Sequence, residues 1–455
     1  MFEKIKQVRR NNRERIDLTR LIENCHQLLG ERGESNSVSV ATTALTAYRN
    51  LSPEAIEHFF QVLALEFDPD PGELLMLAEK YAVNRSPEHL VALARAAEPP
   101  RQELLRRLNR APGGAAEIVK MRAKLLHYLR KDRKLSAVDA DFEHLLGSWF
   151  NPGFLNLVQV DWQSPAMLLE KLIQHEAVHA IDGWADLRRR LQPDRRCFAF
   201  FHPTLPDEPL IFVEVALLPE MPAAIAPLLD RDIPPNLDPR RFKVAAFYSI
   251  SNCQPGLKGV NLGNFLIKRV AERLKAEFPS LKIFCTLSPV PGFTAWLEKV
   301  KEIDDPRLKP MQVQTLNTGL VELRRRHGTD FGGLSHRVSE PSGQKAPDGT
   351  WQRISQPFGR KVERDLGLLQ SLCAFYLWQT SAVDTRPSDP VARFHLNNGA
   401  SLARINLRAD TSKKGLKQSL ALMVNYLYDL EEVESNHERF VRDDVHCSPS
   451  VLKLL

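Results

Sequence analysis

A serine and a histidine in the second half of the chain have the side chains and the surroundings that acid–base chemistry needs. Ser288 follows 282–287, an apolar strand, and strand ends are where α/β sheets present functional groups to ligands. His395 lies in the segment FHLNNGA, beside the turn that Gly399 predicts. Each also has a structural interpretation, Ser288 as a turn or cap residue and His395 as a hydrogen-bonded histidine near the core. Both are candidates for proton transfer.

A second candidate site is the glycine-containing stretch that joins a strand to a helix. Gly256, Gly259 and Gly263 would let the backbone approach a ligand closely. The helix that follows has one apolar face, and the free N–H groups of a helix N-terminus favour phosphate oxygens. This combination predicts a pyrophosphate cradle, with a plain connecting turn as the alternative. The stretch is not a Walker A loop, because no GK[ST] follows, and its glycines do not fit GxGxxG.

A third motif is HEAVH. His175, Glu176 and His179 match HExxH, in which two histidines on one helical face hold zinc and the glutamate acts as base. A catalytic zinc needs a third protein ligand, and the glycine and histidine that continue the metzincin motif are absent here. Glu208 or Glu214 could replace that ligand, yet both lie in or beside a predicted strand. The preferred interpretation is two histidines packed on one face of a long helix.

The elements that would position these residues follow from the hydrophobic periodicity. Between residues 18 and 129 apolar residues recur every three or four positions, which predicts a run of short helices. The pattern changes near residue 150, and from there strands and helices alternate. Ser164 and Pro165 start a helix that is expected to reach residue 191. The other expected elements are strands over 196–201, 210–218, 244–251 and 282–287, a helix after residue 264 and helices from 361 to 379.

Composition excludes several classes of protein. The chain of 455 residues exceeds the size of one hydrophobic core, so at least two domains are expected. Hydrophobic residues make up 43% and no run approaches a membrane-spanning length, which argues against a disordered chain and against a membrane protein. The net charge of +6 is spread along the chain, which argues against nucleic-acid binding. Six scattered cysteines and the absence of an export signal predict reduced thiols in the cytoplasm.

Seven stretches, in order along the chain, resemble the malonyl-CoA decarboxylase family. They are SWFNPGFLNL, EAVHAI, RRCFAFFHPTLPDEPLIFVEVAL, FYSISNCQPGLKGVNLGNFLIKRV, LSPVPGFTAWL, DPVARFHLNNGA and MVNYLY. The resemblance implies an α+β chain: an N-terminal all-helical bundle domain over 1–150 for oligomerisation, then a GNAT-like (acyltransferase-type) mixed α/β catalytic domain over 151–455. It implies a carboxy-lyase with malonyl-CoA as substrate, acetyl-CoA as product, no cofactor and a homotetramer built as a dimer of dimers.

The resemblance also implies roles for individual residues. By position, Ser288 and His395 are the catalytic residues, and Ser288 contacts the substrate. The implied CoA-binding loop falls on the predicted cradle and consists of Lys258, Gly259, Val260, Asn261, Leu262, Gly263 and Asn264. Animal members of the family have a glutamate in the loop where this chain has Asn261. EAVH belongs to the structural framework of the family, which implies no zinc.

The chemistry of this substrate sets the expected mechanism. Loss of CO2 from a malonyl thioester leaves an enolate, so the enzyme must stabilise negative charge on the thioester oxygen and then protonate the carbon. We assign His395 as the proton donor and Ser288 as the partner that accepts and relays the proton. This exchange needs a neutral histidine, which predicts best activity near neutral pH.

Three other functions are alternatives on this evidence. A GNAT-type acyl-CoA-dependent acyltransferase would use the same cradle together with an acceptor site. A zinc hydrolase would use His175 and His179. A non-enzymatic CoA sensor would bind its ligand near Ser288 and His395 without turnover.

Overall fold

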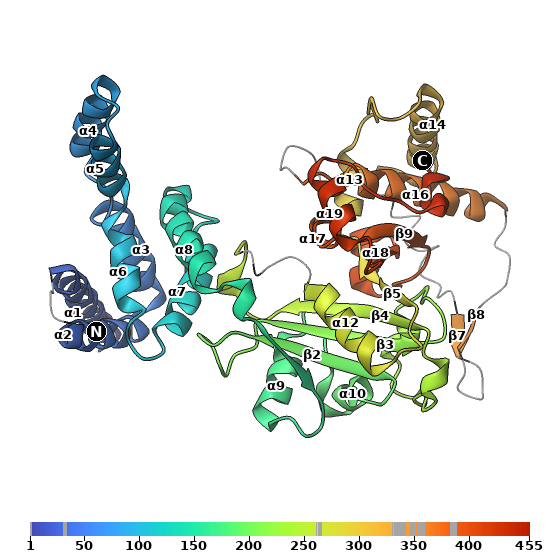
Figure 1. Ribbon diagram of the computed structural model, residues 1–455, viewed down its shortest axis with the longest axis horizontal. Helices are drawn as coiled ribbons and strands as arrows, with labels where there is room; N and C mark the ends of the chain where they lie inside the picture. The colour runs from blue at the N-terminus through green and yellow to red at the C-terminus, as the bar shows by residue number, and fades with distance from the viewer. Residues whose placement is uncertain are drawn as a thin grey trace. The chain divides into compact units, whose positions relative to one another are not determined.

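The computed structural model describes most of the chain (Figure 1). The described residues are 2–30, 34–260, 262, 266–329, 331, 343–345, 351–353, 360–382 and 389–455. The chain divides into two compact units. The first comprises Met1–Asn156, Phe201–Leu210 and Cys253–Gly263, and the second comprises Leu157–Phe200, Ile211–Asn252 and Asn264–Leu455.

The first unit is built from helices, as the periodicity predicts. They are α1 (Phe2–Gly30), α2 (Glu34–Arg49), α3 (Pro53–Leu65), α4 (Pro71–Val83), α5 (Pro87–Ala97), α6 (Pro100–Leu108), α7 (Gly114–Tyr128) and α8 (Ser136–Trp149). Ser52, Asp70 and Ser86 each precede a proline and accept a hydrogen bond from a backbone N–H in the first turn of α3, α4 and α5. A side-chain cap followed by proline at the first helical position sets these three helix starts. The predicted N-cap at Ser52 is confirmed.

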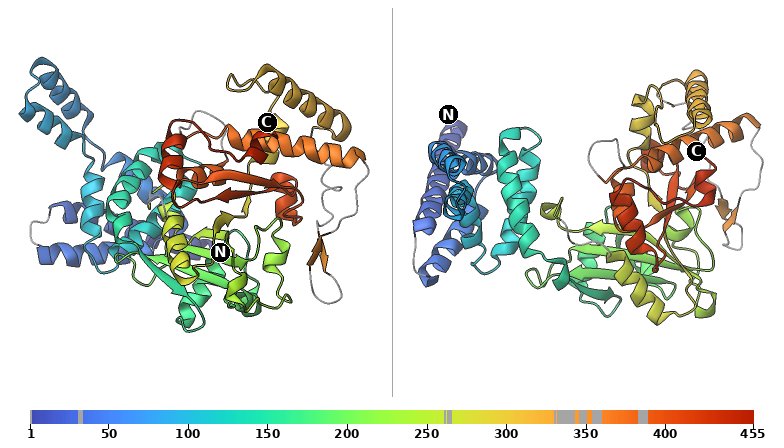
Figure 2. Two further views of the ribbon diagram at one scale, coloured as in Figure 1. Left: turned by 45° about the vertical axis from the view of Figure 1, so that its right-hand side comes forward. Right: turned by 45° about the horizontal axis from the view of Figure 1, so that its top comes forward.

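Burial divides these helices into a packed group and a projecting pair. Tyr48, Phe59, Phe60 and Leu125 belong to the apolar interior formed by α2, α3 and α7. The helices α4 and α5 contain no buried residue, and Val83 at the end of α4 is 89% exposed. Figure 2 shows this pair projecting from the other helices of the same unit. The pair therefore gains little stability from packing within the chain.

The second unit is organised around a mixed sheet of eight strands among the described residues. Its order is β1-β2-β3-β4-β5-β10-β6, with β9 paired to β10. The strands are β1 (Asn156–Val160), β2 (Arg195–Phe201), β3 (Ile211–Leu218), β4 (Val244–Asn252), β5 (Ile283–Thr286), β6 (Ser288–Pro289), β9 (Ser401–Asn406) and β10 (Met423–Leu427). The pair β4–β5 is parallel, whereas β10 runs antiparallel to β5, β6 and β9. The four strands predicted from 196 to 287 are confirmed.

Helices surround this sheet. They are α9 (Ala166–His175), α10 (Gly183–Arg190), α11 (Ala226–Leu229), α12 (Leu266–Glu277), α13 (Phe293–Lys299), α14 (Pro310–His327), α16 (Arg360–Trp378), α17 (Pro390–Asn397), α18 (Lys413–Ser419), α19 (Val433–Val441) and α20 (Pro449–Leu452). Glu214 of β3 points to the α10 side, where Arg190 donates to it. Phe200 lies on the opposite face of the sheet, where the guanidinium of Arg269 from α12 stacks over its ring. The described segments Gly343–Lys345 and Trp351–Arg353 form a separate pair of strands, β7 and β8.

The prediction of one long helix over 164–191 is wrong. The structure has α9 and α10 with a non-helical segment between them. Glu176 turns the chain out of the helix, because its carboxylate accepts the backbone N–H groups of Val178 at 2.9 Å and His179 at 2.8 Å. Lys414 donates to two carbonyl groups of the same segment. Tertiary partners therefore satisfy backbone groups that a continuous helix would pair internally.

Candidate active site

Ser288 and His395, the residues singled out for proton transfer, lie within hydrogen-bonding distance. Ser288 Oγ and His395 Nε2 are 2.9 Å apart, although 107 positions separate them in the chain. Ser288 is the first residue of β6, where pairing with β10 aligns it with Val424. His395 lies in the last turn of α17. Both are buried, with exposed fractions of 6% and 3%. The structure therefore brings the predicted pair together away from bulk water.

The hydrogen bonds continue on both sides of this pair. His395 Nδ1 lies 2.9 Å from the hydroxyl of Tyr428, which follows β10. Ser288 Oγ donates to Thr286 Oγ1 at 2.9 Å, and Thr286 Oγ1 also accepts the backbone N–H of Tyr426 at 3.2 Å. Four side chains, from Tyr428 through His395 and Ser288 to Thr286, thus form one hydrogen-bonded chain.

The number of protons available sets which atom donates in each hydrogen bond along this row of side chains. Ser288 has a single hydroxyl proton, and Oγ donates it to Thr286. The bond between Ser288 and His395 must then be donated by Nε2–H, which leaves Nδ1 as the acceptor for the Tyr428 hydroxyl. This tautomer points the imidazole proton at the serine. It is the orientation that a proton donor acting through Ser288 requires.

Burial keeps the imidazole neutral. It lowers the pKa of His395 to about 3, because the charged ring would lose its hydration. Burial also raises the pKa of Tyr428 well above its ordinary value, so this phenol keeps its proton. The ring of Tyr426 stacks on the imidazole with centroids 4.5 Å apart, which fixes the plane of the ring. The expectation of a neutral histidine agrees with this environment.

Asp389 connects the segments that carry the two residues. Its Oδ1 accepts the backbone N–H groups of Val391 and Ala392 and so caps α17, the helix of His395. Its Oδ2 accepts the backbone N–H of Gly292, four residues after Ser288, at 3.0 Å. The sequence signal for this cap is Asp389 before Pro390, the same pattern that starts α4.

The described residues of the implied CoA-binding loop follow β4 and belong to the first unit, whereas Ser288 and His395 belong to the second. The described residues of the loop are Lys258, Gly259, Val260 and Leu262, and its other members, Asn261, Gly263 and Asn264, lie outside the described residues. Lys258 and Gly259 are exposed, while Val260 and Leu262 are buried. The described part of the loop therefore offers one cationic side chain and one bare backbone position to solvent.

Gly256 and Gly259 are needed for different structural reasons. Gly259 has a φ of 84°, a left-handed conformation that glycine adopts without strain. A Cβ at Gly256 would lie only 1.9 Å from the carbonyl oxygen of Val119 in α7. The prediction that Gly256 makes room for a ligand is therefore wrong, because the room is taken by the backbone of α7.

HEAVH does not present its histidines as a zinc motif does. His175 ends α9, and His179 lies in the non-helical segment that follows, so the two do not share a helical face. The carboxylate of Glu176 is held by the hydroxyl groups of Ser249 at 2.7 Å and Ser251 at 3.1 Å. Within the part of the chain that the structure describes, no three His, Cys, Asp or Glu side chains group as metal ligands.

Models of the two domains of one enzyme family match the sequence. The malonyl-CoA decarboxylase C-terminal domain matches residues 153–455, and the malonyl-CoA decarboxylase N-terminal domain matches residues 67–150. The chain belongs to the malonyl-CoA decarboxylase family. The mitochondrial malonyl-CoA decarboxylase of Rattus norvegicus is 37% identical over 363 residues, which cover 77% of this chain and 70% of the rat protein. That of Anser anser anser is 34% identical over 399 residues, with coverages of 83% and 75%.

Solved structures of malonyl-CoA decarboxylases have the same fold. The protein from Rhodopseudomonas palustris is 43% identical, with a TM-score of 0.81 and coverage of 96% of this chain and 99% of that one. The protein from Agrobacterium vitis is also 43% identical, with a TM-score of 0.78 and coverages of 95% and 99%. The predicted family is confirmed, and so is the predicted order of a helical region and a mixed α/β domain.

Sequence reasoning missed two side chains of the candidate site. Tyr428 hydrogen-bonds His395 and Thr286 hydrogen-bonds Ser288, and no short motif marks either of them. Tyr428 lies in MVNYLY, one of the stretches that carried the family resemblance. The sequence therefore marked this segment as part of the family pattern but gave no sign that Tyr428 contacts His395. Thr286 is the last residue of β5, two positions before Ser288.

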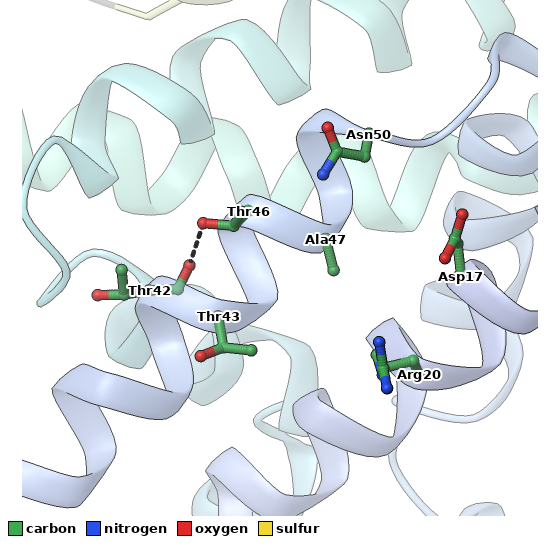
Figure 3. Close-up of a pocket in the computed structure, with 7 residues that line it drawn as sticks. All are labelled: Asp17, Arg20, Thr42, Thr43, Thr46, Ala47 and Asn50. Atoms are coloured by element: carbon green, nitrogen blue, oxygen red, sulfur yellow. Dashed lines mark hydrogen bonds between the residues drawn. The ribbon is translucent and has the colours of Figure 1, made fainter.

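A cavity of about 320 Å³ in the first unit is separate from these residues. It is lined by Asp17 and Arg20 of α1 and by Thr42, Thr43, Thr46, Ala47 and Asn50 from α2 and its end (Figure 3). The three threonine hydroxyl groups donate to backbone carbonyls four residues earlier. None of the predicted site residues lines this cavity.

Among the described residues, no helix is long and apolar enough to cross a bilayer.

Proposed function

We propose that this member of the malonyl-CoA decarboxylase family converts malonyl-CoA to acetyl-CoA and CO2, with Ser288 and His395 as its catalytic residues. The observation that carries the proposal is the buried hydrogen bond between Ser288 and His395, continued at Nδ1 by Tyr428. Family membership supports the choice of substrate and product.

The reaction balances without a redox partner. The bond between the carboxylate carbon and Cα of the malonyl group breaks, and its electron pair stays with the thioester as an enolate. Preorganised hydrogen-bond donors in a site without water stabilise the enolate oxygen more than they stabilise the neutral thioester. Cα then takes one proton, and the product is the acetyl thioester. The proton that the site gives up is replaced from water before the next turnover.

His395 and Ser288 supply that proton in the proposed mechanism. The Ser288 hydroxyl proton, which points at Thr286 in the free site, passes to Cα, and Ser288 takes the Nε2 proton of His395 in the same movement. The negative charge of the enolate thereby passes to the imidazole until a proton from water restores Nε2–H, so the serine relays and the histidine donates. The direction of the hydrogen-bonded chain supports this assignment, since Nε2–H already points at Ser288 Oγ. Tyr428 holds Nδ1 on the opposite side of the ring.

The loop that starts at Lys258 is proposed to hold the phosphates of CoA. Lys258 offers an exposed side-chain amine, and Gly259 is exposed and has no side chain of its own to cover its backbone. Asn261, Gly263 and Asn264 are assigned to the same loop by the family pattern. Asn261 carries no charge where animal members have a glutamate, so no carboxylate step is assigned to it.

The first test is turnover of malonyl-CoA by the purified full-length protein, with and without a strong chelator. We expect equal amounts of CO2 and acetyl-CoA at a rate that the chelator does not change. A protein that releases no CO2, or that transfers an acyl group to an amine instead, would contradict the proposal. Loss of turnover on chelation would direct attention to His175 and His179.

We also propose a division of labour along the chain, with 1–150 serving self-association into a tetramer and 151–455 carrying the reaction. Support for self-association comes from α4 and α5, which bury no residue within the chain. Support for a reducing compartment, which we take to be the cytoplasm, comes from the six cysteines, all of them buried free thiols.

A further inference from the structure

The segment that leads into the CoA-binding loop packs on α7. Gly256 is buried, and its Cα approaches the backbone of Val119 so closely that no side chain fits between them. Leu257, the next residue, is also buried. Within the first unit, α7 therefore supports the backbone from which the described part of the loop starts.

Arg122 of α7 holds this loop by its carbonyl groups. Its Nη1 donates to the carbonyl oxygen of Gly256 at 3.0 Å and to that of Lys258 at 2.7 Å. The rest of the guanidinium is held by two carboxylates of α8, because Nε donates to Asp139 at 2.8 Å and Nη2 to Glu143 at 3.3 Å. Arg122 is only 1% exposed, so its guanidinium depends on these partners rather than on bulk water.

The direction of the Lys258 carbonyl fixes where the N–H group of Gly259 points. Every described peptide bond is trans, and in a trans peptide unit the C=O and N–H groups point in opposite directions. The carbonyl of Lys258 points at Arg122, so the N–H of Gly259 in the same peptide unit points away from α7. Gly259 is exposed and has a left-handed backbone, and a Cβ at this position would lie 3.2 Å from the carboxylate of Glu143, which Arg122 pairs. An N–H group in this position is a donor for a phosphate oxygen.

We infer that Arg122 is a positioning residue for CoA binding: it holds the Lys258–Gly259 peptide unit so that the N–H of Gly259 faces the phosphates. This inference rests on the proposed function, because it takes the loop as the site for CoA phosphates. Without Arg122 the loop samples other orientations, and the apparent affinity falls by the fraction of loops that remain competent. Arg122 donates its hydrogen bonds to the loop and to α8, so we expect its loss to change binding and not the rate of the bound complex.

The test compares Arg122→Lys with Arg101→Lys in the full-length protein. A lysine keeps the charge but not the planar fork that reaches two carbonyls and two carboxylates. Arg101 is the matched control: it is 3% exposed, pairs with Asp68 and Asp141, and donates to carbonyl groups outside the loop. We expect Arg122→Lys to raise the Kd of CoA and the KM of malonyl-CoA about tenfold with kcat unchanged. Arg101→Lys is expected to change none of these values.

Two further variants separate the possible failures. Gly256→Ala places a methyl group against the carbonyl of Val119, lifts the loop from α7, and should weaken CoA binding as Arg122→Lys does. Lys258→Ala reports on the loop itself. If Lys258→Ala weakens CoA binding while Arg122→Lys and Arg101→Lys behave alike, the role of Arg122 is refuted and the loop stands. If Lys258→Ala leaves CoA binding unchanged, the assignment of the loop is refuted, and the inference about Arg122 with it.

Discussion

At the residue scale, two tyrosines contact His395, and they differ in whether the hydroxyl group has a hydrogen-bond partner. The hydroxyl of Tyr428 lies 2.9 Å from Nδ1, whereas the hydroxyl of Tyr426 has no hydrogen-bond partner among the described residues. Both rings are completely or almost completely buried and both pack against the imidazole. Removing each hydroxyl group in turn therefore separates the effect of the hydrogen bond from the effect of the ring.

Tyr428→Phe should lower kcat about tenfold and leave the KM of malonyl-CoA unchanged, because a neutral hydrogen bond that sets the tautomer is lost while the ring remains. Tyr426→Phe is the control and should keep the kcat of the parent protein. Steady-state kinetics with malonyl-CoA measure both. Equal kcat values in the two variants would show that the bond to Nδ1 does not set the proton position.

The burial of His395 also predicts how stability changes with pH. In the unfolded chain the imidazole takes a proton below about pH 6.5, while in the folded protein its pKa is about 3. Between these values the unfolded state binds more protons, so stability falls as the pH falls. From pH 7 to pH 5 this group should cost about 2 kcal/mol, a loss that His395→Gln should not show. Urea unfolding at the two pH values measures the difference, and identical losses in both proteins would contradict the assigned burial.

At the element scale, Asp389 joins α17 to the turn after β6. Its two oxygens divide the work: Oδ1 caps the helix of His395, and Oδ2 holds Gly292. The carboxylate is completely buried, and burial raises the pKa of Asp389 above its ordinary value. The cost of burying it is offset by four donors, three from the backbone and one from Tyr376.

Asp389→Ala should cost about 1 to 3 kcal/mol of stability and also lower kcat, because the segments of Ser288 and His395 lose their common anchor. Asp389→Asn should keep the cap and lose one of the two acceptor oxygens, giving a smaller fall in kcat. Asp70 caps α4 in the same way but stands far from these residues in sequence and lies in the other unit. Asp70→Ala should therefore cost about 1 kcal/mol with kcat unchanged. A parent-like kcat in Asp389→Ala would contradict the anchoring role.

At the scale of the whole molecule, the proposed tetramer needs surfaces that the chain does not cover itself. Leu75, Val83 and Leu90 on α4 and α5 are 63%, 89% and 48% exposed, and large exposed apolar side chains on paired helices mark contact surfaces. Leu75→Glu combined with Val83→Glu should reduce the mass measured by sedimentation equilibrium. Val321→Glu on α14, where the side chain is 63% exposed, is the control and should keep the parent mass. An unchanged mass in the α4 variant would place the contact elsewhere.

Much of the fold and part of the candidate site could be predicted from the local sequence. Strand ends, N-caps before proline and helical periodicity act over a few residues, so the start of α3 and the strands that lead to Ser288 could be predicted. The contact of His395 with Tyr428 could not, because it depends on β10 entering the sheet between β5 and β6. The break after α9 was missed for the same reason, since Ser249 and Ser251, which hold Glu176, lie on β4.

The most direct test of the central claim is kcat for malonyl-CoA decarboxylation in Ser288→Ala and His395→Asn, with the Kd of CoA measured on the same preparations. If these residues relay the proton to Cα, each variant should lose about a hundredfold or more in kcat, because a positioned acid contributes about that much. The Kd of CoA should stay unchanged. Near-parental turnover in both variants would contradict the account.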